Sequence, residues 1–185
     1  GYQVKIVDGN ALEASEHRLK ELRGVEAGAL PGKSLVVYEP AAGLVSDVFP
    51  CEDGHAQERS LFTAVLRTVQ AGDLWIADRN FCTIDFLWGI AARGGYFVMR
   101  QHGQLQGTLV GSRTYKGAVD TGKVYEQRID LVNAQGDTMT LRRMTVALHE
   151  PTRDGDAAIH LLSNVPRRQA SAQTLAASYR KRWTI

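Results

Sequence analysis

Residues 73–100 read DLWIADRNFCTIDFLWGIAARGGYFVMR, and this stretch decides the fold class. Residues 73–78 form a short apolar run that ends on an acid, which is typical of a buried strand. Residues 83–93 place apolar side chains at helical spacing and stop at two glycines, and residues 96–100 form another apolar run. A helix between two such strands predicts an α/β protein.

The flanking segments add strands before this unit and an antiparallel region after it. Upstream we expect three strands, the second and third forming a hairpin, and then one helix: residues 4–7, 35–38, 44–49 and 58–70. Residues 103–150 are rich in Gly, Thr and Arg in short alternating stretches, which predicts an antiparallel β insertion after the fifth strand. A strand at 158–163 and a helix at 170–185 follow. This order matches the ribonuclease-H-like fold, a mixed α/β sheet flanked by helices, with residues 1–102 and 151–185 as its core.

Composition excludes several classes of protein. Of the 185 residues, 44% are hydrophobic and 23% are charged, which argues against disordered, collagen-like and coiled-coil chains. No apolar run approaches the ~18 residues that a membrane helix needs, so we expect no membrane partner. Cys51 and Cys82 are too few for a disulfide scaffold or a structural zinc site, which favours a reducing cytosol. The chain begins on a strand-like stretch and stops inside a predicted helix, so we expect a piece of a longer protein.

Charge is unevenly distributed along the chain. The net charge is +2, but residues 1–100 hold 10 Lys and Arg against 13 Asp and Glu, whereas residues 101–185 hold 12 against 7. No acid follows Asp156. An acidic half joined to a basic tail suits a carboxylate metal site beside a polyanion, and a solvated basic face on the last helix explains the same distribution.

Two aspartates are candidates for a metal site. Asp8 and Asp78 each end a hydrophobic run that reads as a strand. Ligands of open α/β sheets gather at the carboxyl ends of neighbouring strands, and carboxylate oxygens are the ligands of Mg²⁺ and Mn²⁺. The alternative is that each acid is a helix N-cap or a turn residue.

Polar and aromatic residues near these acids are candidates for phosphate contacts. Arg79 can neutralise a phosphate, while Asn80 or Thr83 caps the next helix; the alternative is an ordinary loop. On the last helix, Tyr179 and Arg182 share one face with Leu175, because the three are spaced i, i+4 and i+7. The alternative is an amphipathic helix that packs this face on the sheet.

The sequence resembles the DDE transposases of bacterial insertion sequences, in the group usually called the IS-four family. The resemblance covers essentially the whole chain. It is carried by four segments, which are Val7-Asp8-Gly9-Asn10 with Glu16-His17-Arg18-Leu19, Gly54-His55-Ala56-Gln57-Glu58-Arg59, Leu74-Trp75-Ile76-Ala77-Asp78-Arg79-Asn80-Phe81, and Tyr179 with Arg182. The last pair matches the opening of the family's Tyr-(2)-Arg-(3)-Glu signature.

The resemblance implies roles for these residues. Asp8 and Asp78 would be the first and second catalytic aspartates and ligands of Mg²⁺ or Mn²⁺. Tyr179 and Arg182 would hold DNA phosphate. The third acid, a glutamate, would occupy the position after Ile185. Residues 1–185 alone are therefore expected to be inactive, and the two-metal site is expected only in the full-length protein.

The resemblance also implies the partners. The substrate would be double-stranded DNA, as insertion-sequence ends and target, bound by a homodimer in the bacterial cytoplasm at the nucleoid. Besides Tyr179 and Arg182, the residues expected to contact DNA are Arg79, Asn80 and Lys181 near the acids and Arg113, Lys116, Arg142 and Arg143 in the insertion.

Two other functions fit the same residues. A degenerate remnant would bind DNA through its positive charge without catalysis. An unrelated ribonuclease-H-like nuclease would cleave DNA without strand transfer.

Overall fold

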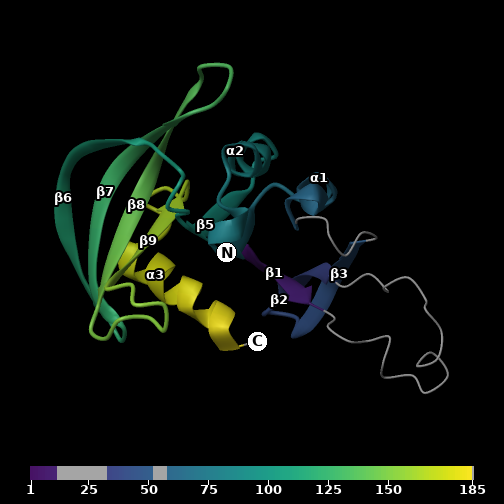
Figure 1. The fold of residues 1–185 in the computed structure, drawn as a ribbon, viewed down its shortest axis with the longest axis horizontal. Coiled ribbons are helices and arrows are strands. Elements are labelled where there is room, and N and C mark those ends of the chain that lie inside the picture. The colour runs from purple at the N-terminus through teal and green to yellow at the C-terminus, as the bar shows by residue number, and fades with distance from the viewer. Residues whose placement is uncertain (12–32, 52–57, 185) are drawn as a thin grey trace.

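The computed structural model describes residues 1–11, 33–51 and 58–184, and shows a mixed sheet with helices on both faces (Figure 1). The nine strands of these residues form one sheet, whose order from edge to edge is β3 (Leu44–Cys51), β2 (Lys33–Glu39), β1 (Gln3–Ala11), β4 (Asp73–Ala77), β5 (Tyr96–Arg100), β9 (Ala158–Ser163), β8 (Thr138–Leu148), β7 (Gly122–Val132) and β6 (Thr108–Val119). The predicted ribonuclease-H-like α/β sheet with an antiparallel insertion is confirmed.

Parallel pairing is confined to the centre of the sheet. Strand β4 pairs in parallel with β1 on one side and with β5 on the other. The strands outside this centre pair antiparallel, including the predicted hairpin of β2 and β3. The parallel pair β4 and β5 is connected by the helix predicted over residues 83–93, because a parallel connection needs a crossover.

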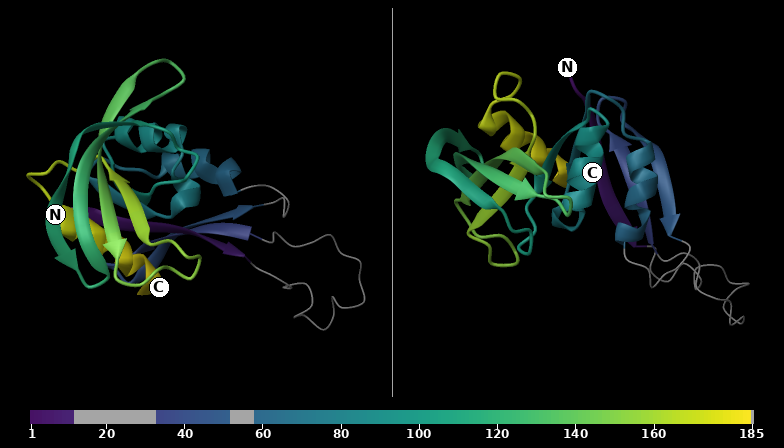
Figure 2. Two further views of the ribbon diagram at one scale, coloured as in Figure 1. Left: turned by 60° about the vertical axis from the view of Figure 1, so that its left-hand side comes forward. Right: turned by 90° about the horizontal axis from the view of Figure 1, so that it is seen from above.

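Helices cover the two faces of the sheet unequally (Figure 2). Helices α1 (Phe62–Arg67) and α2 (Ile84–Ala92) pack on the face that carries Trp75 and Phe97. Helix α3 (Ala172–Arg180) packs on the opposite face, with Ile76 and Val98. Strands β4 and β5 are therefore buried on both faces, which explains their continuous apolar sequence.

In the described part of the chain, three short 3-10 helices adjoin the α-helices or follow a strand. They are η3 (Glu58–Leu61), η4 (Arg79–Phe81) and η5 (Lys181–Thr184). The helix predicted over residues 58–70 is thus a 3-10 turn followed by the shorter α1. It ends early because the backbone N–H and the hydroxyl of Thr68 both donate to the carbonyl of Val65.

Strand β1 is longer than the sequence pattern predicts, which changes the place of Asp8. The prediction that Asp8 ends its strand is wrong. The pairing of β1 with β4 extends as far as Ile6, but β1 continues to Ala11 because it keeps pairing with β2, where Asp8 lies opposite Val36. Asp8 therefore lies inside a strand that has already separated from its parallel neighbour.

The predicted insertion consists of three long strands that continue the main sheet. Strand β8 pairs with β9, and β7 and β6 follow towards the edge. In Figure 1 these strands curve away from the rest of the sheet and lie beside α3. The insertion is thus joined to the core by backbone hydrogen bonds along β9.

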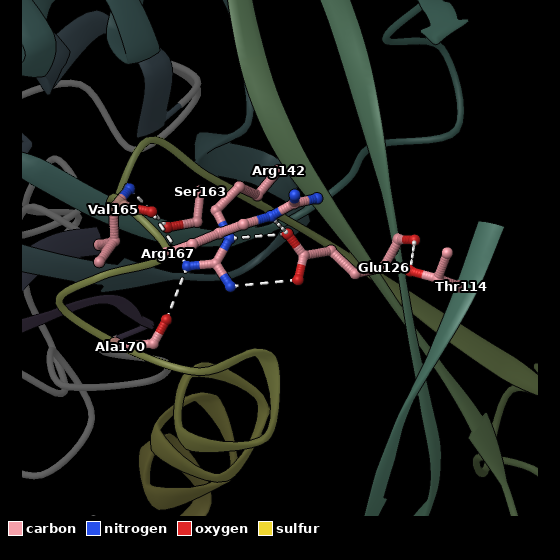
Figure 3. A network of polar contacts seen from close by, with 7 residues as sticks. All are labelled: Thr114, Glu126, Arg142, Ser163, Val165, Arg167 and Ala170. Carbon is pink, nitrogen blue, oxygen red and sulfur yellow. Dashed lines mark hydrogen bonds and ion pairs between the residues drawn. The ribbon is translucent and has the colours of Figure 1, made fainter. Parts of the chain in front are cut away.

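A buried polar network joins the insertion to the segment before α3 (Figure 3). The guanidinium of Arg142 donates from Nε and Nη2 to the two carboxylate oxygens of Glu126, at 3.0 and 3.3 Å. Its Nη1 donates to the carbonyls of Val165 and Ala170, at 3.0 and 2.8 Å. Arg167 donates from Nε to Glu126 at 2.7 Å. The side chains of Arg142 and Glu126 are only 10% and 3% exposed.

The prediction that Arg142 contacts DNA is therefore wrong. Its donors are used inside the protein, on a buried carboxylate and two backbone carbonyls. Arg143 is half-buried and donates from Nε to Gln101 at 2.7 Å. Arg113 and Lys116 lie on β6 at the edge of the sheet, where Arg113 lies over the ring of Tyr125.

Gly122, at the start of β7, provides a test of the insertion's packing. A Cβ at this position would overlap the backbone carbonyl of Ala147. We expect Gly122→Ala to lower the free energy of unfolding by about 1–3 kcal/mol, because backbone atoms must move apart. Gly103→Ala is the matched control, since no atom lies within 4 Å of a Cβ there. Equal stability of the two variants in urea unfolding would contradict this packing.

The charge on Glu126 makes stability depend on pH. Burial alone raises the pKa of Glu126, but hydrogen bonds and charge from Arg142 and Arg167 outweigh it, and the pKa lies below its usual value of 4.5. The stabilisation is therefore complete above pH 4.5 and is lost as the pH falls through the lowered pKa. We expect Glu126→Gln to lower the free energy of unfolding by about 3 kcal/mol near pH 7 and by much less in strong acid.

Urea unfolding across this pH range measures the difference. The control is Glu150→Gln, which changes an exposed glutamate. The charged network would be refuted by a cost of Glu126→Gln that does not shrink in acid.

Candidate active site

Asp8 and Asp78 come from neighbouring parallel strands and lie on the same side of the sheet. Paired residues of β1 and β4 differ by 70 in number, from Gln3 with Asp73 to Ile6 with Ile76, and Asp8 and Asp78 differ by the same amount. Ile6 and Ile76 both face α3, and side chains two residues further along a strand point the same way. The charge on Asp78 raises the pKa of Asp8, so the two carboxylates are close enough to interact. The two predicted acids therefore lie on one side of the sheet and interact electrostatically.

The end of the last helix reaches this pair of acids. Arg182 donates from Nη1 to Oδ2 of Asp8 at 2.9 Å. Its side chain is 6% exposed, whereas that of Asp8 is 51% exposed. The backbone N–H of Gly9 donates to the other oxygen of Asp8 at 3.0 Å. Both oxygens of Asp8 are therefore held, while one side of the carboxylate faces solvent.

Two opposing effects set the pKa of Asp8. Desolvation raises it most, and the Asp78 charge adds to this increase. The Arg182 guanidinium lowers it, as does the Gly9 hydrogen bond, and the net result is a raised pKa. The site therefore disfavours two uncompensated negative charges, and a cation between the carboxylates would relieve this repulsion.

Tyr179 is buried rather than exposed to a DNA surface. It packs with Leu175 and Ala176 against the sheet, and the guanidinium carbon of Arg182 lies 5.8 Å from the centre of its ring. Burial raises the pKa of Tyr179, and the charges of Arg182 and Arg100 oppose this increase. The amphipathic-helix alternative thus describes the packing of Tyr179 and Arg182, and the Arg182 contact to Asp8 adds a link to the acids.

Asp78 also caps the turn that follows it. Its Oδ1 accepts a hydrogen bond from the backbone N–H of Asn80 at 2.7 Å. This is the N-cap alternative for Asp78, and it uses one of the two carboxylate oxygens. Of the two residues predicted to cap the next helix, Thr83 is the N-cap of α2. Its hydroxyl accepts a hydrogen bond from the backbone N–H of Phe86.

The remaining predicted phosphate contacts are exposed and lie on the turns that flank the acids. Arg79 follows Asp78 and pairs at 3.8 Å with Asp154 of the loop between β8 and β9. Asn80 is exposed on the same turn, and Lys181 is exposed directly after α3. These three side chains can meet a ligand without a change in the core.

Arg100 belongs to the same region and was missed from the sequence. It ends β5, the strand next to β4, and its charge acts on Tyr179. It also forms an ion pair with Asp156 at 2.5 Å and lines a cleft of about 540 Å³ with Arg153, Asp154 and His149. Its position at the carboxyl end of a predicted central strand could have identified Arg100 as a candidate site residue from the sequence.

The donor set fits a divalent cation only in part. Within residues 1–11, 33–51 and 58–184, no three His, Cys, Asp or Glu side chains gather in a group that could hold a metal ion. Asp8 and Asp78 supply two carboxylates, and Mg²⁺ is commonly bound by one or two carboxylates together with water and substrate phosphate.

Within residues 1–11, 33–51 and 58–184, no helix is long and apolar enough to cross a membrane.

Removing the Arg182 charge should change the ionisation of Asp8. We expect Arg182→Met to raise the pKa of Asp8 further, because the guanidinium stabilises the carboxylate. A pH titration of the Asp8 carboxyl carbon by NMR measures this. Arg180→Met is the matched control, since Arg180 pairs instead with Asp120 at 2.8 Å. An Asp8 pKa that is the same in both variants would contradict the ion pair.

A comparison with known protein families identifies the family of the chain. The sequence profile of the family described as "Transposase DDE domain" matches residues 1–185. No curated protein sequence matches the chain. Since the profile spans every residue, from the strand that carries Asp8 to the turn that carries Arg182, the chain belongs to the DDE transposase domain family.

Proposed function

We propose that the chain is the catalytic core of a DDE transposase of the IS-four family, which cleaves and joins DNA at the ends of a bacterial insertion sequence. The observation that carries the proposal is that Arg182 contacts Asp8 and that the charge of Asp78 acts on the same carboxylate, within a chain of this family. Asp8 and Asp78 are two of the three catalytic acids. The third is a glutamate that follows Ile185 in a longer chain.

In this mechanism the two aspartates would hold Mg²⁺ or Mn²⁺. Such an ion would help to activate water or a 3′-hydroxyl for in-line attack on a phosphodiester and would stabilise the charge that develops. The protein supplies position: the Gly9 N–H and Arg182 orient the Asp8 carboxylate, and the Asn80 N–H orients that of Asp78. Two carboxylates fixed in this way need little rearrangement when substrate arrives.

The cationic side chains around the acids bind the substrate. Arg182, which donates to Asp8, would also neutralise a phosphate bound beside that carboxylate. Arg79, Asn80 and Lys181 contact the DNA backbone from the exposed turns. Tyr179 supports Arg182 from the core. The DNA is double-stranded, as element ends and target, bound by a homodimer in the cytoplasm at the nucleoid.

Cleavage by a longer chain tests the proposal. We expect residues 1–185 to bind DNA without cutting it, and the chain continued through the glutamate to nick and join the element's own ends with Mg²⁺. Asp78→Asn in the longer chain should lower the rate about a thousandfold or more, because a metal ligand is lost. Asp85→Asn, which changes an exposed acid at the start of α2, is the control and should retain activity.

Three outcomes separate the candidate functions. Joining of cut ends into target DNA supports transposition, whereas cleavage without joining indicates a nuclease. Binding that weakens steeply with salt, with no cleavage even by the longer chain, indicates a remnant that only binds DNA. Either of the last two outcomes refutes the proposed function.

A further inference from the structure

We propose that Arg142 is a positioning residue of the active site: from the β insertion it fixes the start of α3, and α3 in turn places Arg182 against Asp8. This inference deepens the proposed function and rests on it for the role of Asp8. It assigns the insertion a part in building the site, in addition to any contact with DNA.

The first step is the contact between Arg142 and the segment that leads into α3. One nitrogen, Nη1, donates to the carbonyls of Val165 and Ala170, which lie at the two ends of that segment. Backbone N–H groups of Gln169 and Ala170 donate to the carbonyl of Pro166, so the segment is a closed turn. Ser171, directly after it, is the N-cap of α3. Arg142 therefore fixes the turn at the point where the helix begins.

The second step is that Arg142 itself has little freedom. Glu126 of β7 accepts from two of its nitrogens, and the pair is buried between the sheet and the turn before α3 (Figure 3). Arg167, from the turn itself, donates to the same carboxylate. A planar guanidinium with donors on a carboxylate and two carbonyls has a single orientation, which a lysine ammonium cannot reproduce.

The third step is that the insertion supports the rest of α3 as well. The helix packs more extensively on β6 and β7 than on the core strand β5. Gln173 lies against Gly117 of β6, where a Cβ would leave no room for its amide. At the far end, Arg180 pairs with Asp120 in the turn between β6 and β7. The insertion thus holds the helix at its start, its middle and its end.

The last step connects the helix to the acids. Arg182 lies two residues beyond the end of α3 and reaches Asp8 at 2.9 Å. A hydrogen bond is lost once donor and acceptor separate beyond about 3.5 Å, and one residue of helix rises about 1.5 Å. A slip of α3 by less than one residue therefore removes the contact between Arg182 and Asp8.

The experiment measures the position of α3 directly, with no DNA or metal present. Spin labels are placed at Ala177→Cys on α3 and Ala92→Cys on α2, both exposed sites, after replacing the buried Cys51 and Cys82 by alanine. Double electron–electron resonance then gives the distance between the labels. We expect Arg142→Met to shift or broaden this distance by roughly the 1.5 Å rise of one residue, and Arg142→Lys to produce a smaller change.

The matched control is Arg113→Met, which removes another arginine of the insertion, one that contacts Tyr125. It should leave the distance unchanged. In the longer chain, Arg142→Met should lower kcat for cleavage by about tenfold to a hundredfold with a smaller change in the Kd for DNA, as expected for misplaced rather than missing contacts.

An unchanged distance in folded Arg142→Met, or an equal change in Arg113→Met, would overturn the inference. If Arg142→Met fails to unfold cooperatively, Arg142→Lys decides, because lysine keeps the charge without reaching Glu126 and both carbonyls at once. The two proposals fail separately. A distance that shifts in Arg142→Met, with no cleavage by the longer parent chain, supports the positioning role and refutes the proposed function. Cleavage by the longer chain, with no shift in Arg142→Met, supports the proposed function and refutes the positioning role.

Discussion

The ion pair between Asp8 and Arg182 connects the first strand of the chain to the turn after its last helix. The two partners lie 174 positions apart in sequence, so the pair forms only when tertiary packing places the end of α3 beside β1. Its energetic contribution depends on geometry: Arg182 is almost fully buried, and a buried charge with a misplaced partner is costly. The candidate site is therefore a consequence of the whole fold and not of a local loop.

The sheet explains how such a distant pair can be positioned accurately. Strand β9 joins the two parts of the sheet, because it pairs with β5 of the core on one side and with β8 of the insertion on the other. Because β9 also leads directly into the turn that Arg142 holds, the core, the insertion and α3 share one hydrogen-bonded frame. An error in the insertion is thereby transmitted to the position of Arg182.

Much of this arrangement could be predicted from sequence, and the failures have physical causes. The central strands and α2 were predictable because burial on both faces leaves continuous apolar runs, and helical spacing is a local signal. The extent of β1 was not, because it depends on pairing with β2, a long-range contact. Asp8 and Asp78 could be singled out as acids that follow apolar runs, but the partnership of Asp8 with Arg182 has no local signature.

The arginines of the insertion show that the number of charges in a sequence does not predict which of them bind DNA. The basic second half of the chain suggests a surface for DNA, and counting charges treats Arg113 and Arg142 alike. In the structure Arg142 donates hydrogen bonds to Glu126 and to two backbone carbonyls, whereas Arg113 lies on the edge strand over Tyr125. A guanidinium can satisfy several buried acceptors at once, so its presence in a sequence predicts internal architecture as readily as nucleic-acid binding. The partners of an arginine on other strands and turns determine whether it stabilises the protein or binds nucleic acid. Here the partners of Arg142 hold α3, the helix on which the active site depends.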